Sequence, residues 1–196
     1  SDNFNELLDP IRAQYKEVFI VVRCKYQEKT YSRCIYIWVD KDYAAIRGQF
    51  QGYPKKLGSI HLTRPTTVGK AGPRLQPGGI FGATLAAYDH RLIQAQFTIE
   101  EESDHAGFVN ALPMVHNRWM PAIECNGKDS LNEVVTMSGF DAEIGLTFKG
   151  SFEIDFLSSP VEEFQLLVPE ELIKGYYRQV GVSWKGGTTL SRSNLA

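Results

Sequence analysis

Short runs of β-branched and aromatic residues make up most of this 196-residue chain, and glycine, proline and polar turns separate them. From Glu17 to Val39 two such runs flank a polar stretch at 27–29. β-branched and aromatic residues in alternation favour strands, and two such runs joined by a short polar stretch predict a β-hairpin. Between Leu57 and Gly82 glycine and proline are too dense for a long helix. The sequence therefore predicts a mostly β protein.

Further strand-like alternation follows downstream, and we expect a turn at Asp89-His90. A mostly antiparallel β architecture with a few helices, closed or nearly closed so that its edge strands are protected, is the expected result. The chain length favours a single domain spanning 1–196. The strand-like segments are 82–100, 133–150 and 151–159.

Helical signals are few. A short helix or turn is expected at 40–51. Residues 159–179 predict two short helices, because Ser159 suits an N-cap and Pro169 interrupts the segment. The stretch 186–189 lacks the lysine of a phosphate-binding loop and predicts a turn.

The charges are balanced and dispersed. There are 21 basic and 23 acidic residues, a formal net charge of -2, and no polybasic block, which argues against nucleic acid and membrane surfaces as partners. No apolar run approaches the roughly 20 residues needed to span a bilayer. We expect a soluble, cytoplasmic protein, and the opening residue Ser1, which is not Met, leaves room for an upstream segment.

No metal or cofactor is expected. Cys24, Cys34 and Cys125 are odd in number and lack CxxC spacing, so we interpret them as buried reduced thiols. The histidines form no HxH or HExxH pattern. His116 and Arg118 fit no triad spacing, which leaves structural packing and, for Arg118, the anchoring of a substrate carboxylate as the alternatives.

The most distinctive local feature is a pair of adjacent lysines, Lys55 and Lys56, in the segment Gly-Tyr-Pro-Lys-Lys-Leu-Gly. A solvated surface pair is one interpretation. In an extended segment, however, successive side chains point to opposite faces, so one lysine can be buried while the other is not. Burial and a neighbouring positive charge both favour the neutral amine that attacks a carbonyl carbon. Only one of the two lysines can therefore be the buried nucleophile, and either lysine fits this pattern.

This segment resembles the signature of the acetoacetate decarboxylase family, in which the first lysine forms a Schiff base. The resemblance implies that Lys55 is the nucleophile and that the neighbouring Lys56 modulates its pKa. Other motifs resemble that family in the same order along the chain. The resemblance runs from about Tyr15 into the C-terminal third. The further motifs are Tyr15-Lys16-Glu17 before a strand, Trp38-Val39-Asp40, Gly82 to Tyr88, and Leu112-Pro113 to Met120-Pro121.

The resemblance implies a closed conical antiparallel β-barrel with Lys55 in its interior, and a homo-oligomer. It places Glu17 near the bound substrate, where this carboxylate would protonate an enamine or shuttle protons during imine formation. Without the resemblance, Glu17 would be interpreted as a surface carboxylate at the start of a strand. The implied reaction is decarboxylation of a β-keto acid such as acetoacetate through an imine and an enamine.

The chain also departs from the decarboxylase pattern. It reads Arg47-Gly48-Gln49 where decarboxylases usually carry glycine-arginine-glutamate. Gln51 stands four residues before Lys55, as in relatives that act on pyruvate-like 2-oxo acids. The amides of Gln49 and Gln51 would suit a substrate whose carboxylate is retained, since they can donate hydrogen bonds to it. The arginine and second glutamate of the family's N-terminal segment cannot be placed here.

The sequence therefore predicts a lyase that forms a Schiff base with a small keto acid, and its first expectation is β-keto acid decarboxylation. One alternative is a lysine-imine aldolase, dehydratase or cyclase acting on 2-oxo acids. The second alternative is a barrel that binds a small molecule without catalysis. The sequence does not name the substrate.

Overall fold

The computed structural model describes residues 14–105, 107, 111–124, 126–162 and 167–193. The described residues divide into two compact units, one formed by 14–57, 111–141 and 183–193 and the other by 58–107 and 142–182. Both are built mainly of β-strands. No helix in the described segments is both long enough and apolar enough to cross a membrane.

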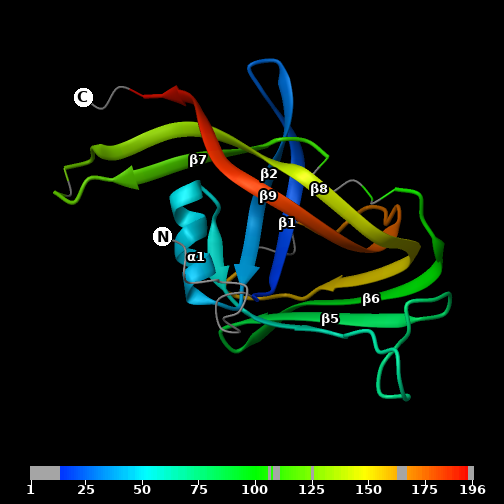
Figure 1. Cartoon of the computed structure of the whole chain (residues 1–196). Coiled ribbons are helices and arrows are strands. Elements are labelled where there is room, and N and C mark those ends of the chain that lie inside the picture. Colours follow the sequence, from blue (N-terminus) through cyan, green and yellow to red (C-terminus); the bar gives the residue numbers. More distant parts are fainter. Residues whose placement is uncertain (1–13, 106, 108–110, 125, 163–166, 194–196) are drawn as a thin grey trace, which may run out of the picture. The chain divides into compact units, whose positions relative to one another are not determined.

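The first unit contains the N-terminal hairpin and a helix. Strand β2 pairs antiparallel with β1 and parallel with β3 and β7. Helix α1 contacts both β2 and β3 and lies beside them in Figure 1. The elements are β1 (Glu17–Tyr26), β2 (Lys29–Val39), α1 (Asp42–Gln51), β3 (Lys55–Leu57) and β7 (Met114–Pro121).

The second unit is an antiparallel meander of β4 (Ser59–Leu62), β5 (Ile80–Ala87) and β6 (His90–Glu102). Two long strands contribute to both units. Strand β8 (Asp129–Phe156) pairs with β7 through its first part and with β6 through its last part. Strand β9 (Gly175–Arg192) pairs with β8.

The N-terminal hairpin forms where the sequence predicts it. Gln27 and Glu28 connect β1 to β2, and both have positive φ angles of 47° and 63°. Such a two-residue left-handed turn matches the twist of the flanking strands. The predicted turn near Asp89 is also confirmed, one residue early, since β5 ends at Ala87 and β6 begins at His90.

Aromatic residues from three neighbouring strands form the core of the second unit. Phe81 pairs with Phe97, and Phe97 with Phe152, so the three rings share one face of the sheet. Phe81, Phe97, Ile99 and Phe148 form the buried cluster, and the partly buried Phe152 packs against it. Each fully buried side chain of this size contributes about 1.5–3 kcal/mol to folding.

The two helices predicted in 159–179 are wrong for the described residues. Residues 159–162 and 167–174 contain no helix, and 163–166 lie outside the described residues. Ser159 Oγ does accept a hydrogen bond from the Val161 amide at 3.2 Å, but this closes a local turn. Pro169 lacks the backbone donor that a helix interior requires, and its ring blocks the preceding turn.

The turn predicted at 186–189 is also wrong, because β9 continues through it to Arg192. Gly186 has a φ of 95°. A Cβ on Gly187 would lie 2.8 Å from the Met137 side chain and 3.0 Å from the Thr136 carbonyl oxygen. These glycines therefore let β9 pass close to β8 and do not reverse the chain.

The mostly β fold class is confirmed, and the short helix expected at 40–51 is α1. Closure into a barrel and the single domain spanning 1–196 stay predictions.

Gly150 offers a test of the packing between β6 and β8. It lies opposite a register shift between Ile99 and Glu101, and an added Cβ would overlap the Thr98 carbonyl, whose carbon is 2.9 Å away. We expect Gly150→Ala to lower the free energy of unfolding by about 2 kcal/mol or more, measured by urea denaturation. Gly181→Ala is the control, because its Cβ would lie 3.9 Å from the nearest atom. Equal effects of the two changes would contradict this account.

Candidate active site around Lys55

Lys55 is the first residue of β3, and strand pairing decides which way it points. Lys55 pairs with Ile37 of β2, and Ile37 pairs with Phe19 of β1. Directly paired residues share a face of the sheet, so these three side chains lie on one side. Lys55 is only 9% exposed there.

Glu17 reaches the same face of the sheet. It pairs with Val39, two residues beyond Ile37, and the two-residue period returns its side chain to the Lys55 side. Lys55 Nζ lies 3.3 Å from Glu17 Oε2. A buried ammonium requires a partner of this kind, because an unpaired charge in an apolar environment is costly. The structure therefore brings together the two residues that the sequence assigned to catalysis.

Gly48 makes room for the lysine. It is buried on α1, and a Cβ at this position would lie 2.6 Å from Lys55 Cγ and 2.7 Å from Lys55 Cε. Any larger side chain would displace the lysine stem or the helix. In the sequence Gly48 is only part of a departure from the family pattern, and its role depends on the tertiary contact between α1 and β3.

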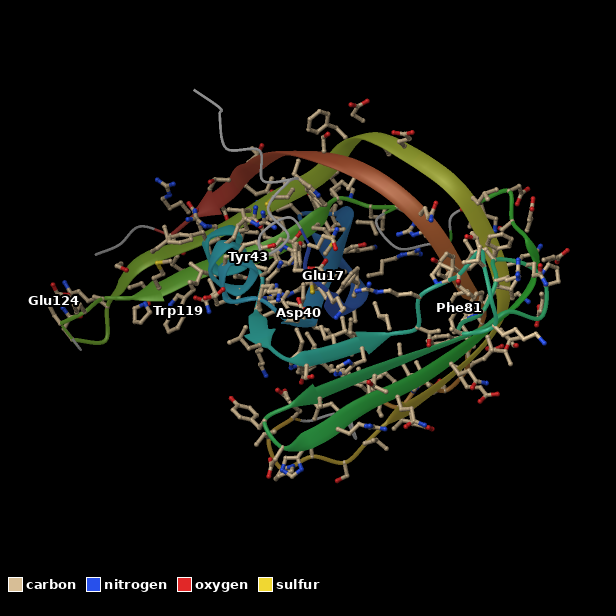
Figure 2. The ribbon with its side chains drawn as sticks, turned by 60° about the horizontal axis from the view of Figure 1, so that its bottom comes forward. Glu17, Asp40, Tyr43, Phe81, Trp119 and Glu124 are labelled. Carbon is tan, nitrogen blue, oxygen red and sulfur yellow. The ribbon has the colours of Figure 1, made fainter. Side chains whose placement is uncertain are left out.

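Two apolar clusters flank the lysine on this part of the sheet. One joins Cys34, Ile37 and Met114 to Phe19, Val21 and Tyr53. The other joins Val39, Ala44 and Ala45 to Tyr15 and Tyr43. Figure 2 marks Glu17, Asp40 and Tyr43, which gather where β1, the end of β2 and the start of α1 meet.

Two tyrosine rings lie near the ammonium. Lys55 Nζ is 5.3 Å from the ring centre of Tyr15 and 5.9 Å from that of Tyr53, within the range of cation–π attraction. Burial raises the pKa of both phenols, and the Glu17 charge raises it further. Both hydroxyls thus stay protonated at neutral pH and can donate hydrogen bonds.

Cys34 is a buried thiol beside the same site. Burial, reinforced by the Glu17 charge and opposed by Lys55, raises its pKa to about 12. The thiol donates a hydrogen bond to the Tyr36 carbonyl oxygen at 3.3 Å. A thiol in this state is a poor nucleophile, so the Lys55 amine is the stronger candidate nucleophile among these side chains.

Lys56 lies on the opposite face of β3, as the alternation predicts. Its Nζ is 5.7 Å from the Tyr36 ring centre and 5.9 Å from the Trp38 ring centre. A different cation, Arg47, lies near the tyrosine that contacts Lys55. Its guanidinium carbon is 5.7 Å from the Tyr15 ring centre. The modulation of the Lys55 pKa by Lys56 stays a prediction.

The two glutamines differ in position. Gln51, half-buried, follows Gly48 by three residues and so shares the helix face that contacts Lys55. Gln49 is exposed and is rotated away from that face. The geometry therefore favours Gln51 over Gln49 as a substrate contact, and both assignments stay predictions.

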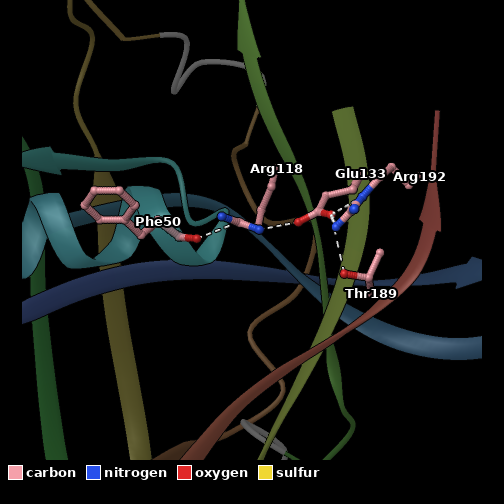
Figure 3. A network of polar contacts seen from close by, with 5 residues as sticks. All are labelled: Phe50, Arg118, Glu133, Thr189 and Arg192. Carbon is pink, nitrogen blue, oxygen red and sulfur yellow. Dashed lines mark hydrogen bonds and ion pairs between the residues drawn. The ribbon is translucent and has the colours of Figure 1, made fainter. Parts of the chain in front are cut away.

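Arg118 makes contacts of another kind. Its Nε donates to the Phe50 carbonyl oxygen at 2.6 Å, and its Nη1 forms an ion pair with Glu133. Figure 3 shows the guanidinium between these two partners. The predicted carboxylate-binding role is untested, and the contacts favour a role in holding α1.

His116 is a buried histidine, and the sequence predicts a packing role for it. It is 2% exposed, its ring centre lies 4.1 Å from that of Tyr53, and neither ring nitrogen has a hydrogen-bond partner among the described residues. Burial, helped by the charge of Arg33, lowers its pKa to about 4. Its apolar neighbours Met114 and Val115, both buried on the same strand, were the available signal for a buried side chain.

His116 should make stability depend on pH. The unfolded chain binds a proton at this residue near pH 6.5, whereas the folded chain does so near pH 4. Stability linked to the neutral ring is therefore complete above pH 6.5 and is lost as the pH falls toward 4. We expect wild type to lose about 2 to 3 kcal/mol more than His116→Phe between pH 7 and pH 4.5, in urea unfolding. Parallel losses in the two proteins would contradict the burial account.

Comparisons with known proteins agree with the fold. The acetoacetate decarboxylase family model matches residues 3–193. The enduracididine biosynthesis enzyme MppR, solved with pyruvate, is 33% identical with a TM-score of 0.86, and the match covers 95% of this chain and 70% of MppR. MppR was also solved with the condensation product of pyruvate and imidazole 4-carboxaldehyde, with a TM-score of 0.87.

Two other solved structures extend the comparison. An acetoacetate decarboxylase-like enzyme from Sphingomonas wittichii RW1 is 26% identical, with a TM-score of 0.86 and coverage of 96% of this chain and 73% of that one. The acetoacetate decarboxylase from Legionella pneumophila is 15% identical, with a TM-score of 0.74 and coverage of 91% and 67%, and shows the shared fold. A comparison with curated proteins found no match. The family match along nearly the whole chain and the 33% identity with MppR show that this chain belongs to the acetoacetate decarboxylase family.

Proposed function

We propose that this enzyme uses Lys55 to form an imine with a pyruvate-like 2-oxo acid and then condenses the resulting enamine with a second carbonyl compound. The observation that carries the proposal is the buried Lys55 amine held 3.3 Å from the Glu17 carboxylate. An amine in this setting has a proton acceptor beside it and little surrounding water.

The reaction begins when Lys55 transfers its ammonium proton, for which Glu17 Oε2 is the adjacent acceptor. The amine lone pair then attacks C2 of the 2-oxo acid and forms a carbinolamine, which loses water to give a protonated imine. Loss of a proton from C3 gives the enamine. The enamine C3 attacks the carbonyl carbon of the second substrate, and water finally hydrolyses the imine to release the product and free Lys55.

Glu17 suits the proton transfers in this sequence. Its side chain is 31% exposed, whereas that of Lys55 is 6% exposed, so the carboxylate can exchange protons with solvent while the amine stays covered. In its protonated form it can donate to the carbinolamine hydroxyl that leaves as water.

The substrate carboxylate has to be retained in this reaction. An amide donor such as Gln51 can bind a carboxylate without an acidic group that would repel it. The position of Gln51 on the same helix face as Gly48 supports this role, and the exposed Gln49 is the weaker candidate.

Decarboxylation of a β-keto acid such as acetoacetate is the second candidate, because it passes through the same Lys55 imine. The comparisons favour the 2-oxo acid, since MppR was solved with pyruvate at 33% identity while the Legionella decarboxylase is 15% identical. A binding protein without catalysis is the remaining alternative. The homo-oligomeric state and the cytoplasmic location also stay predictions.

The proposal is tested by reduction with sodium borohydride in the presence of pyruvate and, separately, of acetoacetate. We expect peptide mass mapping to locate a pyruvate adduct on Lys55. Lys55→Ala should abolish the adduct and Lys56→Ala should retain it, because the second amine lies on the other face of β3. Release of carbon dioxide from acetoacetate without a stable pyruvate adduct would favour the decarboxylase, and no adduct with either substrate would favour the binding protein.

Gly48 provides a second test. Gly48→Ala should stabilise an isolated helix by up to about 1 kcal/mol. In the folded protein its Cβ would displace Lys55. We expect the rate of adduct formation with pyruvate to fall at least about tenfold, because small misplacements of a reacting group have large effects on rate. An unchanged rate in a folded Gly48→Ala protein would show that the lysine stem does not depend on this glycine.

A further inference from the structure

We propose that Glu133 is a positioning residue for the lysine segment and that it acts through Arg118 on the end of helix α1. This inference rests on the proposed role of Lys55. It assigns to the reaction a buried carboxylate that does not touch Lys55.

The chain between α1 and Lys55 is short. The helix ends at Gln51, and only Gly52, Tyr53 and Pro54 separate it from Lys55. Pro54 restricts the geometry of the residue before it. A shift of the helix end would therefore change the position of Lys55.

The last carbonyls of a helix lack partners within the helix. At the end of α1 two of them are satisfied locally, by hydrogen bonds from the Gly52 amide to Gln49 at 3.1 Å and from the Tyr53 amide to Gly48 at 2.9 Å. The Phe50 carbonyl is instead satisfied by Arg118 Nε of β7, at 2.6 Å. A cation at this end also interacts favourably with the helix dipole.

Gly52 brings the same segment against β7. Its φ is 87°, and an added Cβ would lie 3.0 Å from both the Asn117 carbonyl oxygen and Arg118 Cγ. The lysine segment therefore packs closely on the strand that carries Arg118.

Glu133 fixes the orientation of Arg118. The two residues are directly paired across β7 and β8, and Arg118 Nη1 forms an ion pair with Glu133 Oε1. The carboxylate is fully buried and its other oxygen is held by Arg192, with Nη2 at 2.8 Å and Nε at 3.0 Å, and by Thr189 at 3.4 Å. Figure 3 shows Arg192 and Thr189 approaching from β9.

Burial gives this network its rigidity. The Glu133 side chain is 0% exposed, against 28% for Arg118 and 64% for Arg192. A buried carboxylate is costly without charged partners. Glu133 therefore favours the Arg118 orientation that keeps their ion pair, and in that orientation Arg118 also reaches Phe50. The hydrogen bonds from Arg192 and Arg118 hold the pKa of Glu133 below its ordinary value, so the anion persists at neutral pH.

The test compares adduct formation with pyruvate in three variants of the full chain. Glu133→Gln removes the anion that orients Arg118. Arg118→Lys keeps a cation for Glu133 but replaces the planar guanidinium, whose Nε binds Phe50 and whose Nη1 binds Glu133, with a single nitrogen that has to serve both positions. We expect Glu133→Gln and Arg118→Lys each to lower the saturating rate of borohydride-trappable adduct formation at least about tenfold, with a small change in the pyruvate concentration that gives half of that rate.

Arg192→Gln is the matched control. It removes the other cation of Glu133, which lowers the stability of the fold, but it leaves the link from Arg118 to Phe50 in place. We therefore expect the folded variant to react at a rate within about twofold of wild type. The proposal is overturned if Arg192→Gln slows the reaction as much as Glu133→Gln, or if Arg118→Lys reacts at the wild-type rate.

Hydrogen exchange separates this inference from the proposed reaction. We expect the Gly52 and Tyr53 amides to exchange faster in Glu133→Gln than in wild type, while amides in the β1–β2 hairpin keep their wild-type rates. If wild type forms no pyruvate adduct, the proposed function fails, and exchange alone decides whether Glu133 holds this segment. Unchanged exchange at Gly52 and Tyr53 in Glu133→Gln would overturn the inference.

Discussion

The first unit is arranged around one energetically costly feature, the buried ammonium of Lys55. Its charge is compensated by Glu17 at 3.3 Å and by the faces of two tyrosine rings. Removal of a charge from water costs several kcal/mol unless a partner offsets it. The hairpin that supplies Glu17 and the helix that supplies Gly48 are both needed to place this charge. Local folding and the candidate chemistry thus depend on the same contacts.

Two kinds of constraint hold the lysine. Strand register fixes its direction, because pairing with Ile37 determines the face on which Lys55 lies and gives the opposite face to Lys56. Helix α1 sets how closely the lysine packs, because Gly48 has no side chain and lets the aliphatic part of Lys55 lie against the helix. A functional group on helices and strands is held in position more precisely than a functional group on a loop. The contact from Arg118 to Phe50 extends this restraint to the end of the helix.

The parts of the site that were predictable from sequence depend on local periodicity. The opposite orientation of Lys55 and Lys56 follows from the strand alternation alone. The family resemblance supplied Glu17. The network around Glu133 was not predictable, since its members come from β7, β8 and β9 and meet only through long-range pairing. The N-cap preference of Ser159 predicts a helix that the described residues do not form, because the same hydroxyl also suits a local turn with the Val161 amide. Gly186 and Gly187 were misread as a turn because their close approach to β8 is a tertiary feature.

The most direct test of the central claim is a crystal structure of the wild-type protein after reduction with borohydride in the presence of pyruvate. The account predicts continuous electron density between Lys55 Nζ and C2 of the former pyruvate, with the Glu17 carboxylate within hydrogen-bonding distance of the modified nitrogen. Density for an adduct on another lysine, or an unmodified Lys55 in crystals that contain the bound ligand, would contradict it.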